Sequence, residues 1–197
     1  MGSLRTQVGI IGAGPSGLAL AQLLQLAGVD SVVLERRSRD YVLGRVRAGV
    51  IEQGTVEILR RAGVARRLER EGLIHHGVEI AAGERCHRID FTAQSGSVTV
   101  YGQTELTKDL MDARDAGGAP PVFEVDGVVL EDIDRERPRL RYTRGGETHV
   151  LECDFIAGCD GYHGVSRTSV PAERITQHER IYPVSYTHLT LPTNREV

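Results

Sequence analysis

Few features of the chain indicate a metal site, a membrane span or a nucleic-acid partner. Its 197 residues include three cysteines, which form no C-x-x-C pair, and its histidines do not stand at ligand spacing, so neither a disulfide framework nor a zinc site is expected. The apolar runs are too short to cross a bilayer, and the N-terminus lacks the build of a signal peptide. The arginines are spread along the chain rather than gathered in one tail. We therefore expect a cytoplasmic protein with reduced thiols and with no metal, membrane or nucleic-acid partner.

What remains is an ordinary globular composition. The net charge is −3 and 40% of the residues are hydrophobic, and the length suits one domain with a sizeable core. The chain shows no internal repeat and no low-complexity stretch. Its organisation therefore has to be inferred from motifs and periodicity.

The clearest motif lies at the start of the chain. An apolar strand over residues 8–11 leads into a G-x-G-x-x-G turn made by Gly12, Gly14 and Gly17, and the amphipathic helix that follows closes at Gly28. A second strand over residues 31–34 ends at Glu35, where a carboxylate can bind an adenosine ribose. A glycine-rich helix entry without a ligand is the alternative. The correct spacing of strand, helix and acid favours a dinucleotide-binding βαβ unit.

Each glycine of the turn has its own expected task. Gly12 permits the tight turn, Gly14 lets the backbone approach a pyrophosphate, and Gly17 lets the helix pack closely on the strand. The helix N-terminus then presents N–H groups and a positive dipole to the phosphates.

A basic loop follows Glu35, with five arginines among residues 36–47. Charge runs are usually solvated surface. This one leaves the strand end that faces the nucleotide, where arginine can bind pyrophosphate oxygens or a 2′-phosphate. We therefore predict that Arg45 and Arg47 face the phosphates.

The middle of the chain shows helical and then alternating patterns. Residues 49–62 are predicted to form a helix with Val50, Ile51, Ile58 and Leu59 inward, followed by a shorter helix over residues 64–71. Further strands are predicted over residues 78–80, 87–91 and 97–101. Another helix is predicted over residues 103–114.

The remaining part is predicted to be a strand meander. Its strands cover residues 122–125, 128–133, 139–143 and 148–151, with Gly145 and Gly146 as a hairpin turn. A buried strand over residues 154–161 runs into a second glycine-containing turn.

These segments together resemble the flavoprotein aromatic hydroxylases. The matching stretches are G-A-G-P-S-G at 12–17, L-E-R at 34–36, D-Y-V-L-G-R-V-R-A-G-V-I-E-Q-G at 40–54, H-x-G-V-E-I at 75–80, Y-G-Q-T-E-L-T at 101–107, C-D-G-Y-H-G-V-S-R at 159–167 and P-A-E-R at 171–174. The stretch R-x-R-A-G-x-x-E-Q is far more specific than the glycine motif. The resemblance implies an α/β fold, namely a Rossmann-like FAD-binding domain with an inserted β-strand meander, over residues 1–183.

The resemblance also implies an FAD site, residue by residue. The pyrophosphate would lie at the glycine turn with Pro15 and Ser16, and Glu35 would bind the adenosine ribose. The residues implied along the phosphates and flavin are Arg45, Arg47, Ala48, Gly49, Val50 and Gln103.

A second set of residues is implied for NADPH and for the substrate. Asp160 and Gly161 match a motif that serves both FAD and NADPH, and His163 and Arg167 would meet NADPH. Arg36, Arg37 and Tyr41 stand where the family selects its coenzyme, and their positive charge favours NADPH over NADH. His75 matches a histidine that relays the phenolic proton of the substrate to solvent. A surface histidine beside His76 is the alternative for that position.

The resemblance stops after Pro183. Residues 184–197 have no clear period and are interrupted by Pro192, so we expect a non-native read-through tail, with a divergent terminus as the alternative. The substrate-binding sheet is expected beyond this point, so the domain is expected to be truncated before it. The chain alone is then expected to be inactive.

The implied activity of the intact enzyme is the FAD- and NADPH-dependent hydroxylation of a small aromatic acid, 4-hydroxybenzoate, to 3,4-dihydroxybenzoate. A homodimer is implied at full length. Two other functions remain open. An NAD(P)-dependent dehydrogenase is disfavoured because a strand meander replaces further βα units, and a non-catalytic flavin- or NADPH-binding module is the other alternative.

Overall fold

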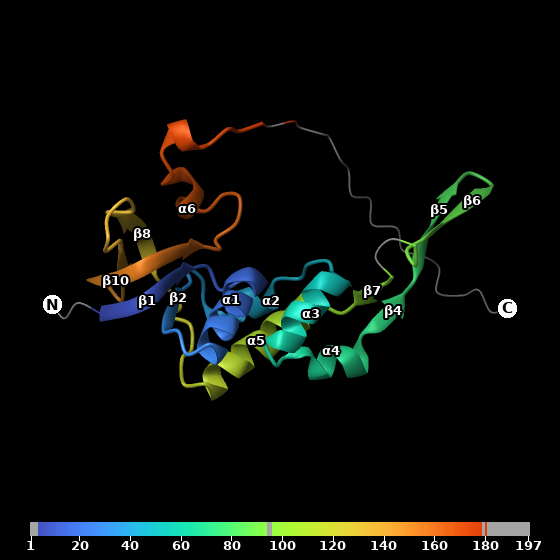
Figure 1. Cartoon of the computed structure of the whole chain (residues 1–197), viewed down its shortest axis with the longest axis horizontal. Coiled ribbons are helices and arrows are strands. Elements are labelled where there is room, and N and C mark those ends of the chain that lie inside the picture. Colours follow the sequence, from blue (N-terminus) through green and yellow to red (C-terminus); the bar gives the residue numbers. More distant parts are fainter. Residues whose placement is uncertain (1–3, 94–95, 179, 181–197) are drawn as a thin grey trace.

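The computed structural model describes residues 4–93, 96–178 and 180 (Figure 1). Its main sheet has five strands in the order β2 (Ser31–Leu34), β1 (Leu4–Ile11), β10 (Glu147–Gly158), β9 (Arg139–Arg144) and β8 (Asp126–Glu131). The β1 strand runs parallel to β2 and β10, whereas β10, β9 and β8 pair antiparallel. A parallel βαβ half is thus joined to an antiparallel meander. This architecture confirms the predicted α/β fold class.

Three helices form the layer beside the parallel strands. Helix α1 (Pro15–Leu26) connects β1 to β2 and packs against α5 (Gln103–Ala116) and α3 (Gln53–Arg61), as Figure 1 shows. Gly28 follows α1 with φ of 71°, a left-handed conformation that glycine adopts without steric penalty. The helix end predicted there is confirmed.

The core lies on both faces of the sheet. Ile10, in β1, packs into a cluster with Leu18, Leu110 and other side chains of the helix layer. The next residue, Ile11, points to the opposite face and packs with Leu140 and other residues of the meander. Successive strand residues alternate between faces, so a strand buried on both sides reads as a continuous apolar run.

A second, smaller sheet continues the chain. It contains β3 (Val50–Glu52), β7 (Val98–Val100) and β4 (Leu73–His75), with β7 in the centre. A hairpin of β5 (Gly77–Ala82) and β6 (Arg85–Asp90) extends from this sheet away from the helices (Figure 1). The remaining elements are α2 (Arg39–Gly44), α4 (Ala65–Glu71), α6 (Val165–Thr168) and the 3₁₀ turn η1 (Ala172–Arg174).

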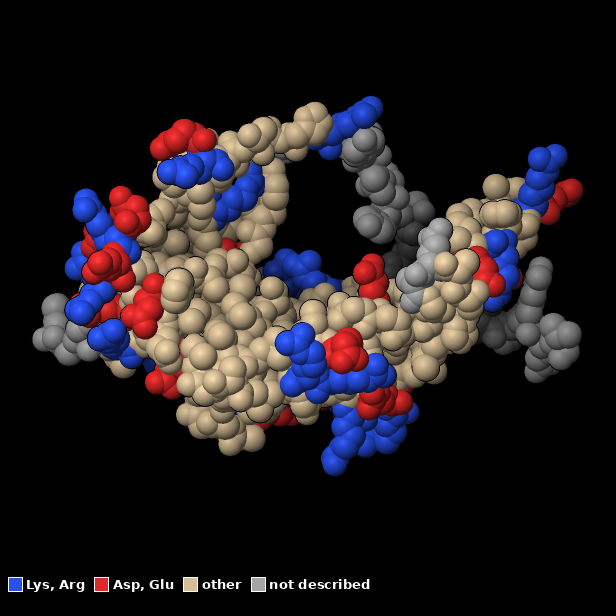
Figure 2. Space-filling model, viewed as in Figure 1, with Lys and Arg blue, Asp and Glu red and all other residues tan. Residues whose placement is uncertain are grey.

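Charged residues of both signs mix at the end of the molecule formed by β8, β9 and β10 (Figure 2). Among their ion pairs, Arg139 meets Asp132 at 2.6 Å and Arg141 meets Glu131 at 2.7 Å. All four side chains are between 28% and 45% exposed, so each pair contributes little to stability. Within the described residues, no helix is long and apolar enough to cross a membrane.

A cation, Arg114, lies in the core. Arg114, in α5, is 1% exposed and donates hydrogen bonds to the Ala21 carbonyl at 3.0 Å, to Gln25 at 2.6 Å and to the Ser31 carbonyl at 3.4 Å. Burial lowers the pKa of its guanidinium. Arg114 therefore ties the end of α5 to α1 and to the start of β2.

Two element predictions were wrong near the start of the second sheet. Residues 49–62 do not form one helix, because residues 50–52 pair with β7 as β3 and α3 begins only at Gln53. Val50 and Ile58, predicted to point inward, are 62% and 40% exposed, whereas Ile51 and Leu59 are buried. Residues 36–47 were predicted as a loop, but residues 39–44 form the short helix α2, which Ser38 caps by accepting the Tyr41 N–H at 3.2 Å.

The meander differs from its prediction in two ways. Residues 122–125 form only an isolated bridge between Val122 and Leu34, because Glu124 takes a left-handed conformation with φ of 60°. The two strands predicted at 148–151 and 154–161 are one strand, β10, which pairs with β9 along its first half and with β1 along its second. The Gly145–Gly146 turn is confirmed, with φ of 59° and 82°. The read-through prediction for residues 184–197 lies outside the described residues.

Candidate nucleotide-binding site

The glycine turn packs tightly against the start of the second glycine motif. Gly12 has φ of 104°, and a Cβ there would lie 2.6 Å from the Cys159 carbonyl oxygen. A Cβ on Gly17 would lie 2.0 Å from the Gly12 carbonyl oxygen. Both positions therefore exclude any side chain, and the turn between β1 and α1 packs against Cys159, the residue that follows β10.

Gly14 differs from Gly12 and Gly17 because a side chain at this position would project into open space. It has φ of −74° and ψ of 176°, and a Cβ would meet no atom within 4 Å. Gly14 is also the N-cap of α1, and no side chain caps this helix end. A helix N-terminus without a side-chain cap, next to open space, suits an anionic phosphate.

Glu35 supports the same turn from the end of β2. Its Oε2 accepts the Ala13 N–H at 2.8 Å and its Oε1 accepts the Arg37 N–H at 2.8 Å. A carboxylate has about four acceptor positions. Glu35 can therefore orient the glycine turn and still accept hydroxyl groups of a ribose.

A pocket of about 240 Å³ opens beside the N-terminus of α1, and we call it the Gln103 pocket. It brings together residues from α1, the loop before β3, and the start of α5. Its lining residues are Pro15, Ala48, Gly49, Val50, Ile51, Glu52, Thr55, Tyr101, Gln103 and Leu106. Five of the residues implied for FAD, Pro15, Ala48, Gly49, Val50 and Gln103, thus line one cavity adjoining the glycine turn.

The backbone at Gly49 is fitted closely to the opposite wall of this pocket. The Tyr101 N–H donates to the Gly49 carbonyl at 2.7 Å, and a Cβ on Gly49 would lie 2.4 Å from the Tyr101 carbonyl oxygen. The tight contact explains why glycine occupies this position.

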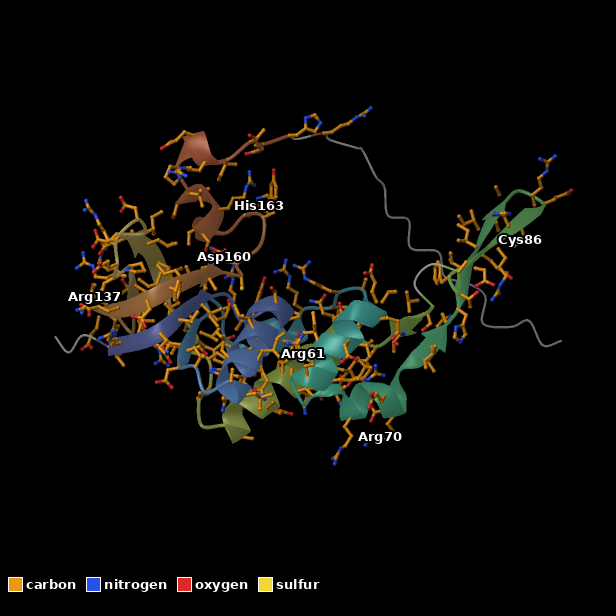
Figure 3. The ribbon with its side chains drawn as sticks, viewed as in Figure 1. Arg61, Arg70, Cys86, Arg137, Asp160 and His163 are labelled. Carbon is orange, nitrogen blue, oxygen red and sulfur yellow. The ribbon has the colours of Figure 1, made fainter. Side chains whose placement is uncertain are left out.

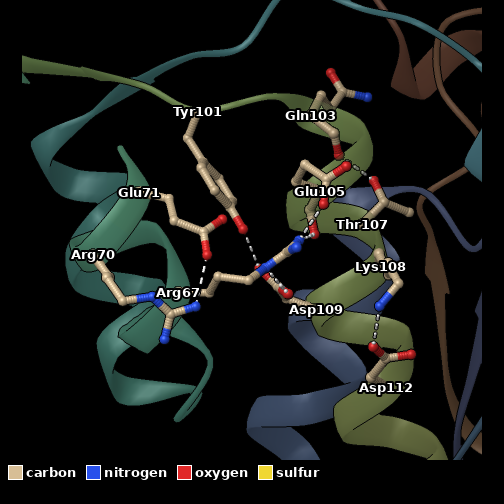
Figure 4. A network of polar contacts seen from close by, with 10 residues as sticks. All are labelled: Arg67, Arg70, Glu71, Tyr101, Gln103, Glu105, Thr107, Lys108, Asp109 and Asp112. Carbon is tan, nitrogen blue, oxygen red and sulfur yellow. Dashed lines mark hydrogen bonds and ion pairs between the residues drawn. The ribbon is translucent and has the colours of Figure 1, made fainter. Parts of the chain in front are cut away.

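A network of charged side chains stands behind Tyr101 (Figure 4). The Tyr101 hydroxyl donates to Asp109 Oδ2 at 2.6 Å, and Arg67 Nε, from α4, donates to Asp109 Oδ1 at 2.8 Å. Arg67 also pairs with Glu105. Burial and the hydrogen bond to Asp109 raise the pKa of the Tyr101 phenol, which therefore stays protonated at neutral pH.

A second pocket, of about 540 Å³, lies beyond the C-terminal end of β2, and we call it the Arg36 pocket. It is lined by Arg36, Arg37, Ser38, Tyr41, Glu124 and Asp126. The Arg37 guanidinium lies over the Tyr41 ring, 4.8 Å from its centroid. The three residues implied for coenzyme selection are thus in one pocket, together with two carboxylates that the sequence did not indicate.

Arg45 and Arg47 lie between α2 and β3, where both side chains are exposed. They line neither of the two pockets. Their predicted contact with phosphates stays a prediction.

The second glycine motif forms a turn after β10. Asp160 Oδ2 accepts the Ser166 N–H at 3.0 Å, and a Cβ on Gly164 would lie 2.0 Å from the Asp160 carboxylate carbon. Gly161 has φ of 77°. Asp160 therefore holds the turn that starts α6, and Figure 3 shows it between the main sheet and His163.

His163 and Arg167 lie beyond this turn. His163 is exposed and contacts the Tyr162 ring edge-on, with 5.1 Å between the centroids. The Arg167 guanidinium lies over the Tyr162 ring, 4.2 Å from its centroid, and donates a hydrogen bond to the Gln177 side chain. The structure thus brings His163 and Arg167 together around Tyr162, and their role with NADPH stays a prediction.

His75 lies apart from these groups. It is exposed at the end of β4, paired with Val98, and it lines neither pocket. The structure does not connect it to the glycine turn, and its predicted relay role stays a prediction.

Cys86 lies on the β5–β6 hairpin at the opposite end of the molecule from Asp160 (Figure 3). No group of three or more potential metal ligands occurs among the described residues.

Several residues at these sites were not predicted. Cys159 lies under the glycine turn, and burial raises the pKa of its thiol. Tyr101, Thr55 and Leu106 line the Gln103 pocket. Tyr101 stands within a stretch that the resemblance includes, but no local pattern distinguishes a pocket residue from a core residue.

Comparisons with known proteins agree with this geometry. The FAD-binding domain family matches residues 5–194. The p-hydroxybenzoate hydroxylase of Acinetobacter baylyi is 47% identical over 188 residues, which cover 94% of this chain and 46% of that protein. A 3-(3-hydroxy-phenyl)propionate/3-hydroxycinnamic acid hydroxylase of Burkholderia vietnamiensis is 46% identical over 80% of this chain and 30% of its own length.

Solved structures show the same fold. The anhydrotetracycline hydroxylase of Streptomyces rimosus superposes with a TM-score of 0.67 at 28% identity, over 80% of this chain and 32% of that one. The p-nitrophenol 4-monooxygenase of Pseudomonas putida has a TM-score of 0.71 at 20% identity, over 85% of this chain and 43% of that one. The chain spans half or less of the length of each of these relatives. Its sequence match and fold show that it belongs to the FAD-binding domain family of flavoprotein monooxygenases, which includes the aromatic hydroxylases.

Proposed function

We propose that this chain is the nucleotide-binding part of an FAD-dependent, NADPH-using aromatic-ring monooxygenase that converts 4-hydroxybenzoate to 3,4-dihydroxybenzoate. The observation that carries the proposal is the continuity of the open glycine turn at Gly14 with the Gln103 pocket, through Pro15. The substrate class comes from the likeness to the Acinetobacter hydroxylase.

The described residues fit FAD by their chemistry. The uncapped N-terminus of α1 would hold the pyrophosphate, Glu35 the adenosine ribose, and the Gln103 pocket the parts of the cofactor beyond the phosphates. Bound FAD supplies the two-electron redox chemistry and the reaction with dioxygen. The protein groups described here would bind and orient the cofactor, and the raised pKa of Tyr101 keeps its phenol protonated at neutral pH.

The choice of NADPH rests on the Arg36 pocket. Two guanidinium groups in a pocket can bind a 2′-phosphate, which NADH lacks. Glu124 and Asp126 line the same pocket and would repel that phosphate, so the preference depends on the arginines outweighing them. A dehydrogenase is disfavoured because β9 and β8 continue the sheet antiparallel, where further parallel βα units are expected.

Hydroxylation is expected to need more chain than these residues. They correspond to 46% of the length of the Acinetobacter hydroxylase. We therefore expect the 197-residue chain to bind FAD without hydroxylating an aromatic substrate, and the complete protein to carry the activity.

Two measurements test the proposal. Flavin fluorescence titration of the purified chain should show FAD binding, and tight NAD binding without flavin affinity would contradict it. A chimera that joins residues 1–183 to the complementary C-terminal part of the Acinetobacter hydroxylase should oxidise NADPH and form 3,4-dihydroxybenzoate. A chimera that binds FAD and NADPH but forms no product would favour a non-catalytic binding module.

A further inference from the structure

The Gln103 pocket is backed by a partly buried polar network that touches the pocket through Tyr101. Tyr101 is 5% exposed and lines the pocket, while its hydroxyl points away to Asp109 on α5 (Figure 4). The Asp109 side chain is 14% exposed, and its second oxygen accepts Arg67 Nε from α4. Three elements, β7 with its following turn, α5 and α4, therefore meet at one carboxylate.

Arg67 is held more firmly than the other arginines of its helix. It binds Asp109 at 2.8 Å and the Glu105 carbonyl at 3.2 Å, it pairs with the Glu105 carboxylate, and its guanidinium lies 5.7 Å from the Tyr101 ring centroid. Charge-assisted bonds in a partly buried site hold side chains in a single geometry. By contrast, Arg70 pairs only with the exposed Glu71 next to it in the sequence.

Tyr101 connects the network to the backbone of the pocket. Its N–H bonds to the Gly49 carbonyl, and Gly49 leaves no space for a Cβ against the Tyr101 carbonyl. The position of the Tyr101 backbone therefore determines the position of the backbone of Ala48, Gly49 and Val50. Gln103, two residues after Tyr101, begins α5 and lines the same cavity.

We propose that Arg67 and Asp109 are positioning residues for FAD, which set the shape of the Gln103 pocket by fixing Tyr101 without touching the cofactor. The inference rests on the proposed FAD site. It predicts that the two residues affect FAD binding only through Tyr101, so their effects are coupled rather than additive.

The test uses the 197-residue chain and FAD. Arg67→Met and Tyr101→Phe should each weaken FAD binding about tenfold in fluorescence titration, and the double variant should bind no more weakly than either single variant. Arg67→Lys should recover part of the loss, because it keeps the charge but not the fork of donors. Arg60→Met is the matched control, because Arg60 pairs with Glu57 and Glu69 on the surface and should leave FAD binding unchanged.

A second readout does not depend on FAD. In the free chain, Arg67→Met should lower the hydrogen-exchange protection of the Tyr101 amide, because the bond to Gly49 loosens. Unchanged protection, or unchanged FAD affinity in folded Arg67→Met and Tyr101→Phe, would overturn the inference and leave the proposed function standing. If the unsubstituted chain binds no FAD while the exchange result holds, the proposed function fails and the network is a structural support alone.

Discussion

Gly14→Ala separates the binding role of the glycine turn from its structural role. Gly14 has φ of −74° and ψ of 176°, which alanine adopts without strain, and its Cβ would meet no atom within 4 Å. A methyl group at this position would therefore not disturb the free chain. It would project into the space that the pyrophosphate is expected to occupy.

The magnitude follows from two opposing effects on stability. Replacing glycine by alanine at a compatible position stabilises a protein by about 0.4–1 kcal/mol through the unfolded state. Alanine is a poorer N-cap than glycine, which costs roughly the same amount. The free energy of unfolding should then change by less than about 1 kcal/mol, or about 2–4 °C in Tm. FAD affinity should fall at least about tenfold, equivalent to about 1.4 kcal/mol.

Two companion variants make the comparison sharp. Gly17→Ala would bring a Cβ to 2.0 Å from the Gly12 carbonyl oxygen, so the backbone must move and stability should fall by about 1–3 kcal/mol or more. Gly44→Ala has no neighbouring atom within 4 Å and lines neither pocket, so it should leave FAD affinity unchanged and raise stability by about 0.4–1 kcal/mol.

The assay combines thermal unfolding of the FAD-free chain with flavin fluorescence titration. FAD binding by Gly14→Ala as tight as that of the unsubstituted chain would contradict a pyrophosphate site beside Gly14. A loss of stability in Gly14→Ala as large as that in Gly17→Ala would contradict the open space beside Gly14.

Three further outcomes are expected. Glu35→Gln should lower the free energy of unfolding by about 1–2 kcal/mol, since the amide can accept only one of the Ala13 and Arg37 N–H groups, and urea titration would show it. Burial raises the pKa of Cys153 to about 11, so the unfolded chain loses this proton first and stability should fall by about 2–3 kcal/mol as pH rises from about 9 to 11. Cys153→Ala should remove that part of the alkaline loss, and an unchanged pH profile would contradict its origin. Leu73 and Ile74 are each 63% exposed on β4, so the chain should bind an apolar dye such as ANS, and Leu73→Lys with Ile74→Lys should reduce both dye binding and aggregation without lowering Tm.

Local patterns predicted the parts of the fold whose partners are close in the sequence. The β2 strand was predicted at residues 31–34, where it lies, and the end of α1 was predicted at the left-handed Gly28. The helix predicted at residues 103–114 corresponds to α5, whose buried residues include Leu106, Leu110 and Met111. Turn glycines and helical periodicity are local properties, so sequence suffices for them.

Long-range pairing accounts for the errors. Residues 50–52 join β7, almost fifty residues later, and that pairing replaces the first turn of a predicted helix. The β4 strand was not predicted because its three residues are exposed and show no alternation of burial. Both segments take their structure from β7, which is not visible in their own composition.

For the candidate site, the sequence by itself determined the chemistry of the turn. The three glycines, Glu35 and the spacing between them predict a dinucleotide-binding unit, and the family match agrees. Only the tertiary structure decided that Tyr101 closes the pocket, that Arg67 reaches it through Asp109, and that Glu124 and Asp126 share a pocket with the coenzyme arginines. Motif residues are adjacent because the chain connects them, whereas these groups meet because packing of distant elements brings their side chains within hydrogen-bonding range.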